Sequence, residues 1–551
     1  MQDLIIRGGT IIDGTGASRY KADIAVKDGI ITHIGDLQDL QAAKELDATG
    51  LMVSPGFIDA HSHSDTAFLR DSSSASKLFQ GVTTEVSGQC GYSPFPSLPE
   101  RLSSSTSELD GDDDWYCASF DDFVKRFEAS KYEMAVNQAI LVGHGSLRAG
   151  VIGYEDRQVT PEELEQMKTL LRKDLQDGAW GLSLGLEYSP GFFASSEELR
   201  ELGKVVKEFD GLVPCHMRNE GLEIDAAIEE LLSVGRTSGV HVHVSHLKVD
   251  NYKVHGRAPE VWAILEKARA EGVNVTADMY PFIASCTSLT IRCPQWSKEG
   301  GGRAVVDFLQ GPRRQEVIEG IRTHYFNAER AETCLFNSDG GLWPEIVGKT
   351  LRYVAEELLH TTDYAEAAAE VLVRTKARAG CIFFVMSEDD MLYFLSKDVG
   401  IGSDGYSYSG DPEKVPGKPH PRSYAAISEF FRRAREHKLC SLEEAVRRVT
   451  SKGADMIGLT DRGILEVGKV ADITVFDPET IGPRATYLDS IQLSQGVHHV
   501  VIGGGVGGMQ AAVTAAQRGH KVVLCEKTDA VGGILKSEHG IFYAYKRVNG
   551  K

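Results

Sequence analysis

The chain has 551 residues, of which 42% are hydrophobic and 25% are charged, and its formal net charge is −20. These proportions are ordinary for a soluble globular protein, and the length predicts two to four structural units. The excess of negative charge argues against a nucleic-acid partner, because phosphate backbones require a basic protein surface.

The 9 cysteines are widely spaced and form no CxxC pair, which does not fit a secreted disulfide framework. The opening residues, MQDLIIRGGTIIDGTG, have neither the basic start nor the apolar run of a signal peptide. No apolar stretch reaches the length of about 18 residues that a membrane span requires. We therefore expect a cytoplasmic protein without a membrane partner, and the sequence does not define its oligomeric state.

Both ends of the chain carry short β-branched runs that end in glycine-containing turns. In residues 1–55 these runs are followed by Asp-Gly and Gly-Gly pairs, which are hairpin signals. Residues 468–477 repeat the pattern near the other end. We therefore predict a small β-sandwich unit to which both chain ends contribute.

Between these ends, strand-like runs alternate with helical patterns. Apolar runs occur at 138–142, 240–244 and 273–277, and a helix is expected over 160–174, which opens with Thr-Pro-Glu-Glu. This opening supplies an N-cap and a proline at the first helical position. The alternation predicts an α/β protein with a parallel sheet, most simply a TIM-like (β/α)8 barrel.

The predicted boundaries follow from these changes of pattern. Residues 1–55 form the first part of the β unit, and residues 56–430 form the barrel. Residues 295–350 interrupt the alternation and are expected to be an insertion. Residues 431–502 hold the last barrel helices and then return to the β unit.

Two histidines, His61 and His63, follow the apolar run 53–58. Residues i and i+2 of an extended strand point to the same side, so the two imidazoles could share one metal ion. The end of a strand is also where barrel active sites lie. Taken alone, the pair could equally be two surface histidines.

Further side chains that can bind metal also stand after apolar runs. Cys90 could instead be an inert core thiol, His216 a buried structural partner, and Asp404 a turn or cap residue. Their recurrence at one face of a barrel favours a site for one or two zinc ions. These additional candidates are Cys90, His216, His246 and Asp404.

Residues 55–65, Pro-Gly-Phe-Ile-Asp-Ala-His-Ser-His-Ser-Asp, resemble the first-strand signature of the metal-dependent amidohydrolase superfamily. The similarity is closer to the N-acyl-D-amino-acid deacylases (D-aminoacylases) and extends over residues 1–502. This resemblance implies zinc-dependent hydrolysis of the amide bond of N-acyl-D-amino acids, which gives a carboxylate and a free D-amino acid. The further segments that carry it are 88–94, 143–148, 181–191, 245–248, 278–282, 402–405 and 420–422.

The resemblance also implies roles for the candidate metal ligands. The tightly bound zinc would be held by Cys90, His216 and His246. A second, weaker metal position would be formed by His61, His63 and Asp404. Cys90 would take the bridging place that a carboxylated lysine has in hydantoinase-like relatives, which argues against a hydantoinase. Asp404 is suited to accept the proton of the attacking water and return it to the leaving amine.

Substrate-binding residues are likewise assigned by the resemblance. Lys248, Tyr280, Ser285 and Arg422 would line the pocket for the α-carboxylate of the small-molecule substrate, where cationic groups are physically expected. Tyr188 would be another group on the substrate side. Arg292 could contact an acidic substrate side chain, although a solvated surface arginine fits the sequence equally well. His144 is expected to be a structural histidine.

Residues 503–551 follow a different pattern. A strand at about 500–502 precedes a GxGxxG motif formed by Gly503, Gly505 and Gly508, and a later strand ends at Glu526. In a dinucleotide-binding fold such glycines admit a pyrophosphate to a helix N-terminus, and the acidic residue binds a ribose hydroxyl. The segment resembles that of flavoprotein oxidoreductases. Because a complete domain of this type needs over ~100 residues, we expect an incomplete βαβ tail that binds neither flavin nor NAD.

The sequence leaves open three alternatives to the deacylation of N-acyl-D-amino acids. The chain could be another zinc amidohydrolase that acts on a cyclic amide or a different N-acyl compound. It could be a flavin- or nucleotide-binding redox protein defined by its C-terminal glycine motif. It could also be a binding protein that kept the barrel without catalysis.

Overall fold

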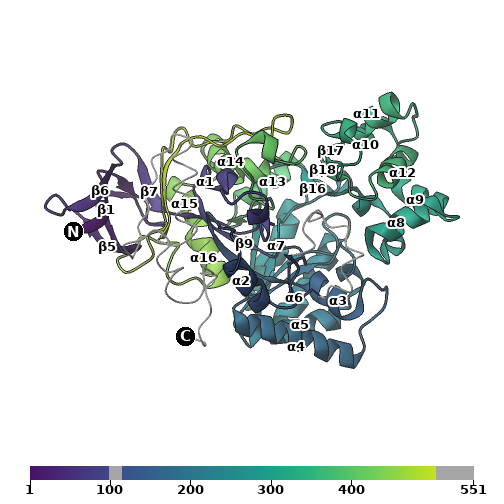
Figure 1. Cartoon of the computed structure of the whole chain (residues 1–551), viewed down its shortest axis with the longest axis horizontal. Coiled ribbons are helices and arrows are strands. Elements are labelled where there is room, and N and C mark those ends of the chain that lie inside the picture. Colours follow the sequence, from purple (N-terminus) through teal and green to yellow (C-terminus); the bar gives the residue numbers. More distant parts are fainter. Residues whose placement is uncertain (98–114, 504–551) are drawn as a thin grey trace.

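The structure, a computed structural model, describes residues 1–97 and 115–503. A small β unit lies at one end of the molecule, the barrel lies in the middle, and a mainly helical insertion lies at the opposite end (Figure 1). The N-terminus is in the β unit. The site described below is located in the barrel, between these two additions.

The β unit is a sandwich of two sheets. The four-stranded sheet has the order β5-β4-β1-β6, and the five-stranded sheet has the order β21-β20-β7-β2-β3. Their bounds are β1 (Gln2–Arg7), β2 (Thr10–Ile11), β3 (Tyr20–Lys21), β4 (Asp23–Lys27), β5 (Ile30–Gly35), β6 (Ala42–Asp47), β7 (Met52–Pro55), β20 (Ile473–Phe476) and β21 (Val497–Val501). Buried aliphatic side chains from both chain ends, including Leu4, Val53 and Ile473, fill the space between the sheets. Both ends therefore build one hydrophobic core.

Eight parallel strand positions form the barrel. They are β8 (Phe57–Asp59), β9 (Val82–Ser87), β10 (Asn137–Ile140) continued by β11 (Val142–Gly143), β12 (Leu182–Gly185), β13 (Leu212–His216), β14 (His241–Val244), β15 (Val275–Met279) and β19 (Gly400–Ile401). The last position meets the first, because the Ala60 amide donates to the Ile401 carbonyl at 3.3 Å and the Asp404 amide donates to the His61 carbonyl at 2.8 Å. The sheet is therefore closed, as the predicted barrel requires.

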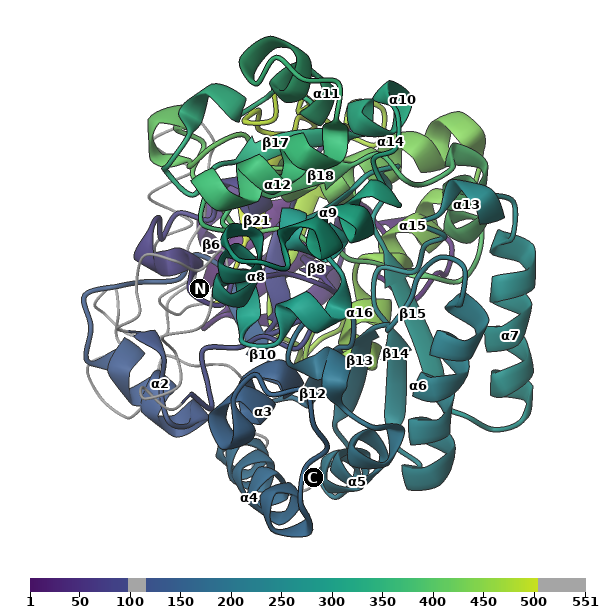
Figure 2. The ribbon, with the colours of Figure 1, turned by 90° about the vertical axis from the view of Figure 1, so that its right-hand side faces the viewer.

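Helices cover the outside of the barrel strands (Figure 2). They include α3 (His144–Ile152), α4 (Pro161–Asp177), α5 (Ser196–Lys207), α6 (Ile224–Ser238), α7 (Ala258–Ala270), α13 (Glu388–Leu395) and α14 (Arg422–His437). Helix α4 starts where the sequence predicts, with a capping box in which Thr160 and Glu163 satisfy each other's backbone amides. Within the described ranges, no helix combines the length and apolar character needed to cross a membrane.

The insertion is a separate layer with its own core, built on the antiparallel sheet β16-β18-β17. Its strands are β16 (Ser285–Ser288), β17 (Cys334–Ser338) and β18 (Gly380–Phe383), and its helices are α8 (Gly301–Gln310), α9 (Arg314–Arg322), α10 (Ala328–Glu332), α11 (Leu351–Tyr353) and α12 (Tyr364–Arg374). It therefore starts earlier and ends later than the predicted range 295–350. The reason is that its short strands look like barrel strands in the sequence.

The strand predicted to open the dinucleotide-binding segment belongs to the β unit. Val500 and Val501 lie in β21, which pairs antiparallel with β20. The Gly503 amide donates to the Asp472 carboxylate at 3.0 Å. A carboxylate therefore occupies the place where a phosphate would have to approach this amide. The other predicted cofactor residues, Gly505, Gly508 and Glu526, lie outside the described residues.

Candidate functional site

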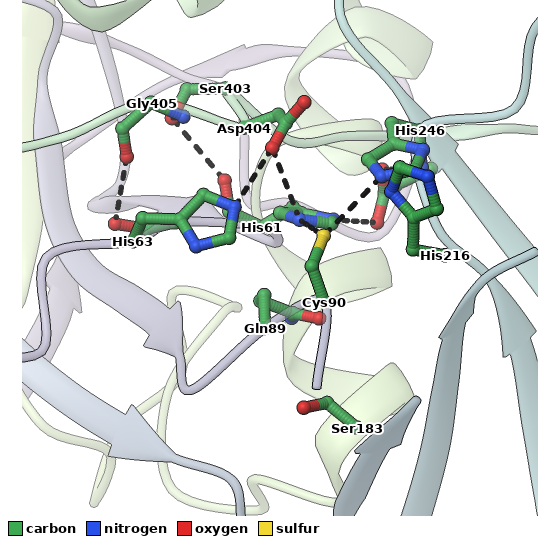
Figure 3. A network of polar contacts seen from close by, with 12 residues as sticks. His61, His63, Gln89, Cys90, Ser183, His216, His246, Ser403, Asp404 and Gly405 are labelled. Atoms are coloured by element: carbon green, nitrogen blue, oxygen red, sulfur yellow. Dashed lines mark hydrogen bonds and ion pairs between the residues drawn. The ribbon is translucent and has the colours of Figure 1, made fainter. Parts of the chain in front are cut away.

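The metal-ligand candidates converge at the carboxyl ends of the barrel strands (Figure 3). The Cys90 Sγ atom lies 3.4 Å from Nε2 of His61 and 3.4 Å from Nε2 of His246. One Asp404 oxygen lies 3.0 Å from Nε2 of His63 and 3.4 Å from Nε2 of His61. The structure thus brings together residues that are more than 300 positions apart in the chain.

The described residues hold three groups of possible metal ligands, and within each group the donor atoms lie within 4.8 Å of one another. Two overlapping groups contain the predicted ligands, and the third consists of Glu187, His216 and Glu220. Cys90 belongs to both of the first two groups. The first group is His61, His63, Cys90 and Asp404, and the second is Cys90, His216 and His246. These are the six residues that the sequence singled out.

Three of these residues have a left-handed backbone, with φ of +53° at Cys90, +38° at His246 and +50° at Asp404. Such values are uncommon for residues other than glycine and carry a conformational cost. Each of the three follows the end of a barrel strand, where the chain must turn. The turn after β9 is also tightly packed, since a Cβ at Gly91 would lie 2.7 Å from the Gly185 amide nitrogen.

Burial and neighbouring charges set the protonation of the site. Burial raises the pKa of the Cys90 thiol well above its usual range, and the Asp404 carboxylate adds to the rise. Burial alone would also raise the pKa of Asp404, but the Arg422 guanidinium holds it well below its usual range. Nη1 of Arg422 lies 2.8 Å from the second Asp404 oxygen. Asp404 is therefore an ionised carboxylate.

The donor set fits zinc. Thiolate sulfur and imidazole nitrogen bind zinc at about 2.3 and 2.0 Å, so two such atoms on one tetrahedral ion lie roughly 3.5 Å apart. The observed separation between Cys90 Sγ and His246 Nε2 is 3.4 Å. Both side chains are almost completely buried, with 4% and 2% exposure. A buried thiol surrounded by imidazoles is thus already spaced as zinc ligands are.

Two carboxylates behind the histidines are absent from the sequence-based candidates. Glu220 lies 3.0 Å from Nδ1 of His246 and 2.6 Å from the Lys248 ammonium. Asp278 lies 3.4 Å from Nδ1 of His61 and accepts the His246 amide at 2.8 Å. Asp278 begins a segment that was recognised for its resemblance, whereas Glu220 has no sequence signal, because its role depends on contacts between different strands.

A cavity of about 400 Å³ opens onto the metal-ligand candidates, between the barrel and the insertion. Cys90, His246 and Asp404 line it, together with the predicted substrate residues Tyr188 and Arg422. Its lining also contains Glu187, which lies 3.0 Å from Nε2 of His216, and two cations of the insertion that the sequence did not indicate. These cations are Lys298 and Arg378.

The other predicted substrate residues do not belong to the cavity lining, as far as the chain is described. Lys248 is paired with Glu220, and Tyr280 is buried with its ring 4.9 Å from the Arg422 guanidinium. Ser285 lies in the sheet of the insertion, and the Arg292 guanidinium stacks on the Phe383 ring at 4.4 Å.

His144 occupies a structural position. Its Nε2 lies 2.8 Å from the Glu198 carboxylate, which also pairs with Arg148. All three side chains are buried. This group links α3 to α5, consistent with the structural role expected for this histidine.

A family model described as "Amidohydrolase family" matches residues 44–281 and 406–506, more than half of the chain. This chain belongs to the amidohydrolase family. A second model, described as "FAD dependent oxidoreductase", matches residues 499–544. The two matches meet in β21, the strand that the sequence pattern assigns to a dinucleotide-binding fold and the structure places in the β unit.

Relatives of this amidohydrolase cover almost its whole length. The D-aminoacylase of Alcaligenes xylosoxydans xylosoxydans is 32% identical over 519 residues, with 94% of this chain and 96% of the relative covered. The N-acyl-D-glutamate deacylase of the same organism is 34% identical over 506 residues, with 91% and 93% covered. A crystal structure of N-acyl-D-glutamate deacylase from Bordetella bronchiseptica, complexed with zinc and a phosphonate inhibitor, matches with a TM-score of 0.78 and 33% identity, covering 91% of this chain and 96% of that chain.

Proposed function

We propose that this amidohydrolase is a zinc-dependent N-acyl-D-amino-acid deacylase, which hydrolyses the amide bond to give a carboxylate and a free D-amino acid. The observation that carries the proposal is the position of Cys90, whose sulfur lies 3.4 Å from histidines of both donor groups. The substrate class comes from the names of the relatives. Two of these proteins match more than nine tenths of this chain at over 30% identity.

We assign the tight zinc position to Cys90, His216 and His246, and the weaker position to His61, His63 and Asp404, with Cys90 adjacent to both. When bound, zinc polarises the amide carbonyl and makes water a nucleophile near neutral pH. Cys90 and His246, whose donor atoms lie 3.4 Å apart, both have a left-handed backbone that the surrounding structure must hold.

Asp404 is the proposed catalytic base and acid. Its carboxylate is held between the Arg422 guanidinium and the His63 imidazole, and it lines the cavity. In this position it can take the proton of the attacking water and deliver it to the leaving amine nitrogen. The proton is returned in the same turnover, so Asp404 ends as the carboxylate with which it started.

The α-carboxylate of the substrate requires positive charge in the cavity. Arg422 reaches the cavity but already binds Asp404, whereas Lys298 and Arg378 contribute positive charge from the insertion. For Lys248 to bind the substrate, its ammonium would have to leave Glu220. We propose that Tyr188, on the cavity wall, contacts the reacting end of the substrate.

A panel of N-acetyl-D- and N-acetyl-L-amino acids, together with cyclic amides such as hydantoins, tests the substrate class. The purified chain should release free amino acid from D substrates and leave L substrates and cyclic amides largely unchanged. Chiral chromatography of the products measures the outcome. No release from any D substrate, or faster release from the L series, would contradict the proposal.

A further inference from the structure

A network of hydrogen bonds runs through the barrel interior behind His61. Asp278 Oδ2 lies 3.4 Å from Nδ1 of His61 and 2.7 Å from Nε2 of His243. Thr276 Oγ1 lies 2.7 Å from Nδ1 of His243 and 2.8 Å from Nε2 of His241. We call His241, His243, Thr276 and Asp278 the interior network. His61, His243 and Asp278 are buried, with at most 1% exposure.

The strand geometry explains this arrangement. His243 pairs with Thr276 in the register between the parallel strands β14 and β15. Residues i and i+2 of a strand share a side, so His241 and His243 face Thr276 and Asp278 across two neighbouring strands. His241 and His243 therefore lie on the same side of β14. They are linked through Thr276 and Asp278 to His61, one of the metal-ligand candidates.

The positions of the protons in the network follow from its donors and acceptors. An ionised carboxylate only accepts hydrogen bonds, so the two imidazole nitrogens that face Asp278 Oδ2 must both carry protons. They are Nδ1 of His61 and Nε2 of His243. A neutral imidazole has one ring proton, so Nε2 of His61 keeps its lone pair. That atom lies 3.4 Å from Cys90 Sγ, whose thiol can donate a hydrogen bond to it. An Asp404 oxygen is also 3.4 Å away, but this contact is not a hydrogen bond and therefore does not require a proton on Nε2.

We infer that Asp278, anchored by His243, is a positioning residue that keeps the His61 proton on Nδ1 and thereby makes Nε2 available to the weaker metal position. Two short hydrogen bonds, from His243 Nε2 at 2.7 Å and from the His246 amide at 2.8 Å, fix the orientation of its carboxylate. The inference rests on the proposed metal centre and adds a residue that contacts ligands of both positions from behind.

Replacing Asp278 by asparagine reverses the pattern of donors. Its carbonyl oxygen can still accept the His246 amide, but its NH₂ group then faces His61 and His243 as a donor. Nδ1 of His61 would have to accept, and the ring proton would move to Nε2, where it blocks a metal. His243 can accommodate the reversal, because Thr276 can accept from its Nδ1 and donate to His241.

The test compares Asp278→Asn with the wild-type full chain and with Asp174→Asn. Asp174 is a matched control because it is equally buried, at 1% exposure, and accepts a backbone amide, that of Phe120, at 2.9 Å. Each zinc-loaded protein is titrated calorimetrically with additional Zn²⁺. In Asp278→Asn the second ion should bind about 10- to 100-fold more weakly, while the first ion stays bound. Asp174→Asn should titrate like the wild type.

A spectroscopic measurement on the wild type supports or overturns the inference even if Asp278→Asn fails to fold. Nitrogen-15 spectra of the metal-free chain should show His61 protonated on Nδ1 and His243 protonated on Nε2. His61 protonated on Nε2 would overturn the inference. So would an unchanged second affinity in Asp278→Asn, an equal loss at both positions, or a wild type that takes up only one ion. A wild type that binds no zinc at all would overturn the proposed function as well.

Discussion

At the scale of single residues, the site depends on side chains whose backbone is constrained where each strand ends. Cys90, His246 and Asp404 all adopt positive φ, and all three line the same cavity. Because this conformation is costly, it persists only where the surrounding structure holds it. Asp404 has a further constraint, since Arg422 and His63 bind its two carboxylate oxygens. Its position and charge are thus set independently of substrate.

Substituting Asp404 by asparagine tests its proposed role in proton transfer. Asp404→Asn keeps the shape of the side chain but removes the basic oxygen. Turnover should therefore fall by a factor of about 10² to 10⁴. Zinc at Cys90, His216 and His246 should remain bound, because Asp404 belongs only to the weaker group. Initial rates and metal content are measured on the same sample. Near-normal turnover would show that another group carries the proton.

A matched substitution controls for the loss of one carboxylate. Asp398 forms ion pairs with Arg447 and Lys452 at the protein surface and does not line the cavity within the described chain. Asp398→Asn should leave both the rate and the zinc content close to those of the wild type. A comparable loss of rate in this variant would point to a general effect on the protein.

The sequence was informative for metal-ligating residues, and less so for the residues that support them. Cys90, His216 and His246 are residue types that bind zinc, and each stands at the end of an apolar run, so type and position together indicate a site. Glu220 and Asp278 act through contacts with histidines of other strands, and no spacing in the chain reveals such contacts. For substrate groups the sequence pattern names residues but does not show how they are paired, and Lys248 is buried in an ion pair with Glu220.

At the scale of elements, a buried charge network joins α1 (Ala75–Leu78) to the first, second and last barrel strands. The Lys77 ammonium lies 2.6 Å from Asp59 and 3.2 Å from Glu85, and it donates to Ser403 Oγ at 2.8 Å. Glu85 also accepts hydrogen bonds from Ser62, at 2.7 Å. The network therefore fixes the backbone that carries His61, His63 and Asp404.

Removing the positive charge from this network should destabilise the protein. Lys77→Met leaves Asp59 and Glu85 buried without their cation, and breaking a buried pair in this way costs about 3–5 kcal/mol. Thermal unfolding followed by calorimetry measures the change. Lys173→Met is the control, since Lys173 forms an exposed pair with Asp177 on α4, which is worth only about 0.3–0.5 kcal/mol. Equal shifts in the two variants would refute the claim that the network stabilises the site.

The sequence predicts the overall architecture more accurately than it predicts the boundaries between the parts. The alternation of strands and helices indicates the barrel, and the glycine-rich hairpins at both ends indicate the shared β unit, because each depends on local periodicity. The predicted insertion 295–350 is too narrow, since two strands of its sheet, Ser285–Ser288 and Gly380–Phe383, lie outside that range. Periodicity identifies a strand but does not say to which sheet it belongs.

At the scale of the whole molecule, the β unit determines how the C-terminal pattern is to be understood. A run that fits the first strand of a dinucleotide-binding fold serves here as β21, the edge strand beside β20. The amide of Gly503 is already bound to Asp472. We expect no stoichiometric flavin in the purified protein, and its visible absorption spectrum would reveal one.

The central claim concerns zinc and stereochemistry together, and one measurement tests both. The release of amino acid from matched N-acetyl-D and N-acetyl-L substrates is followed as zinc is removed with a chelator and then returned. We predict that D-amino-acid release stops without metal and recovers with about one equivalent of zinc per chain, which the set Cys90, His216 and His246 would bind. Undiminished release from the metal-free chain, or zinc-dependent release from the L substrate alone, would contradict the account.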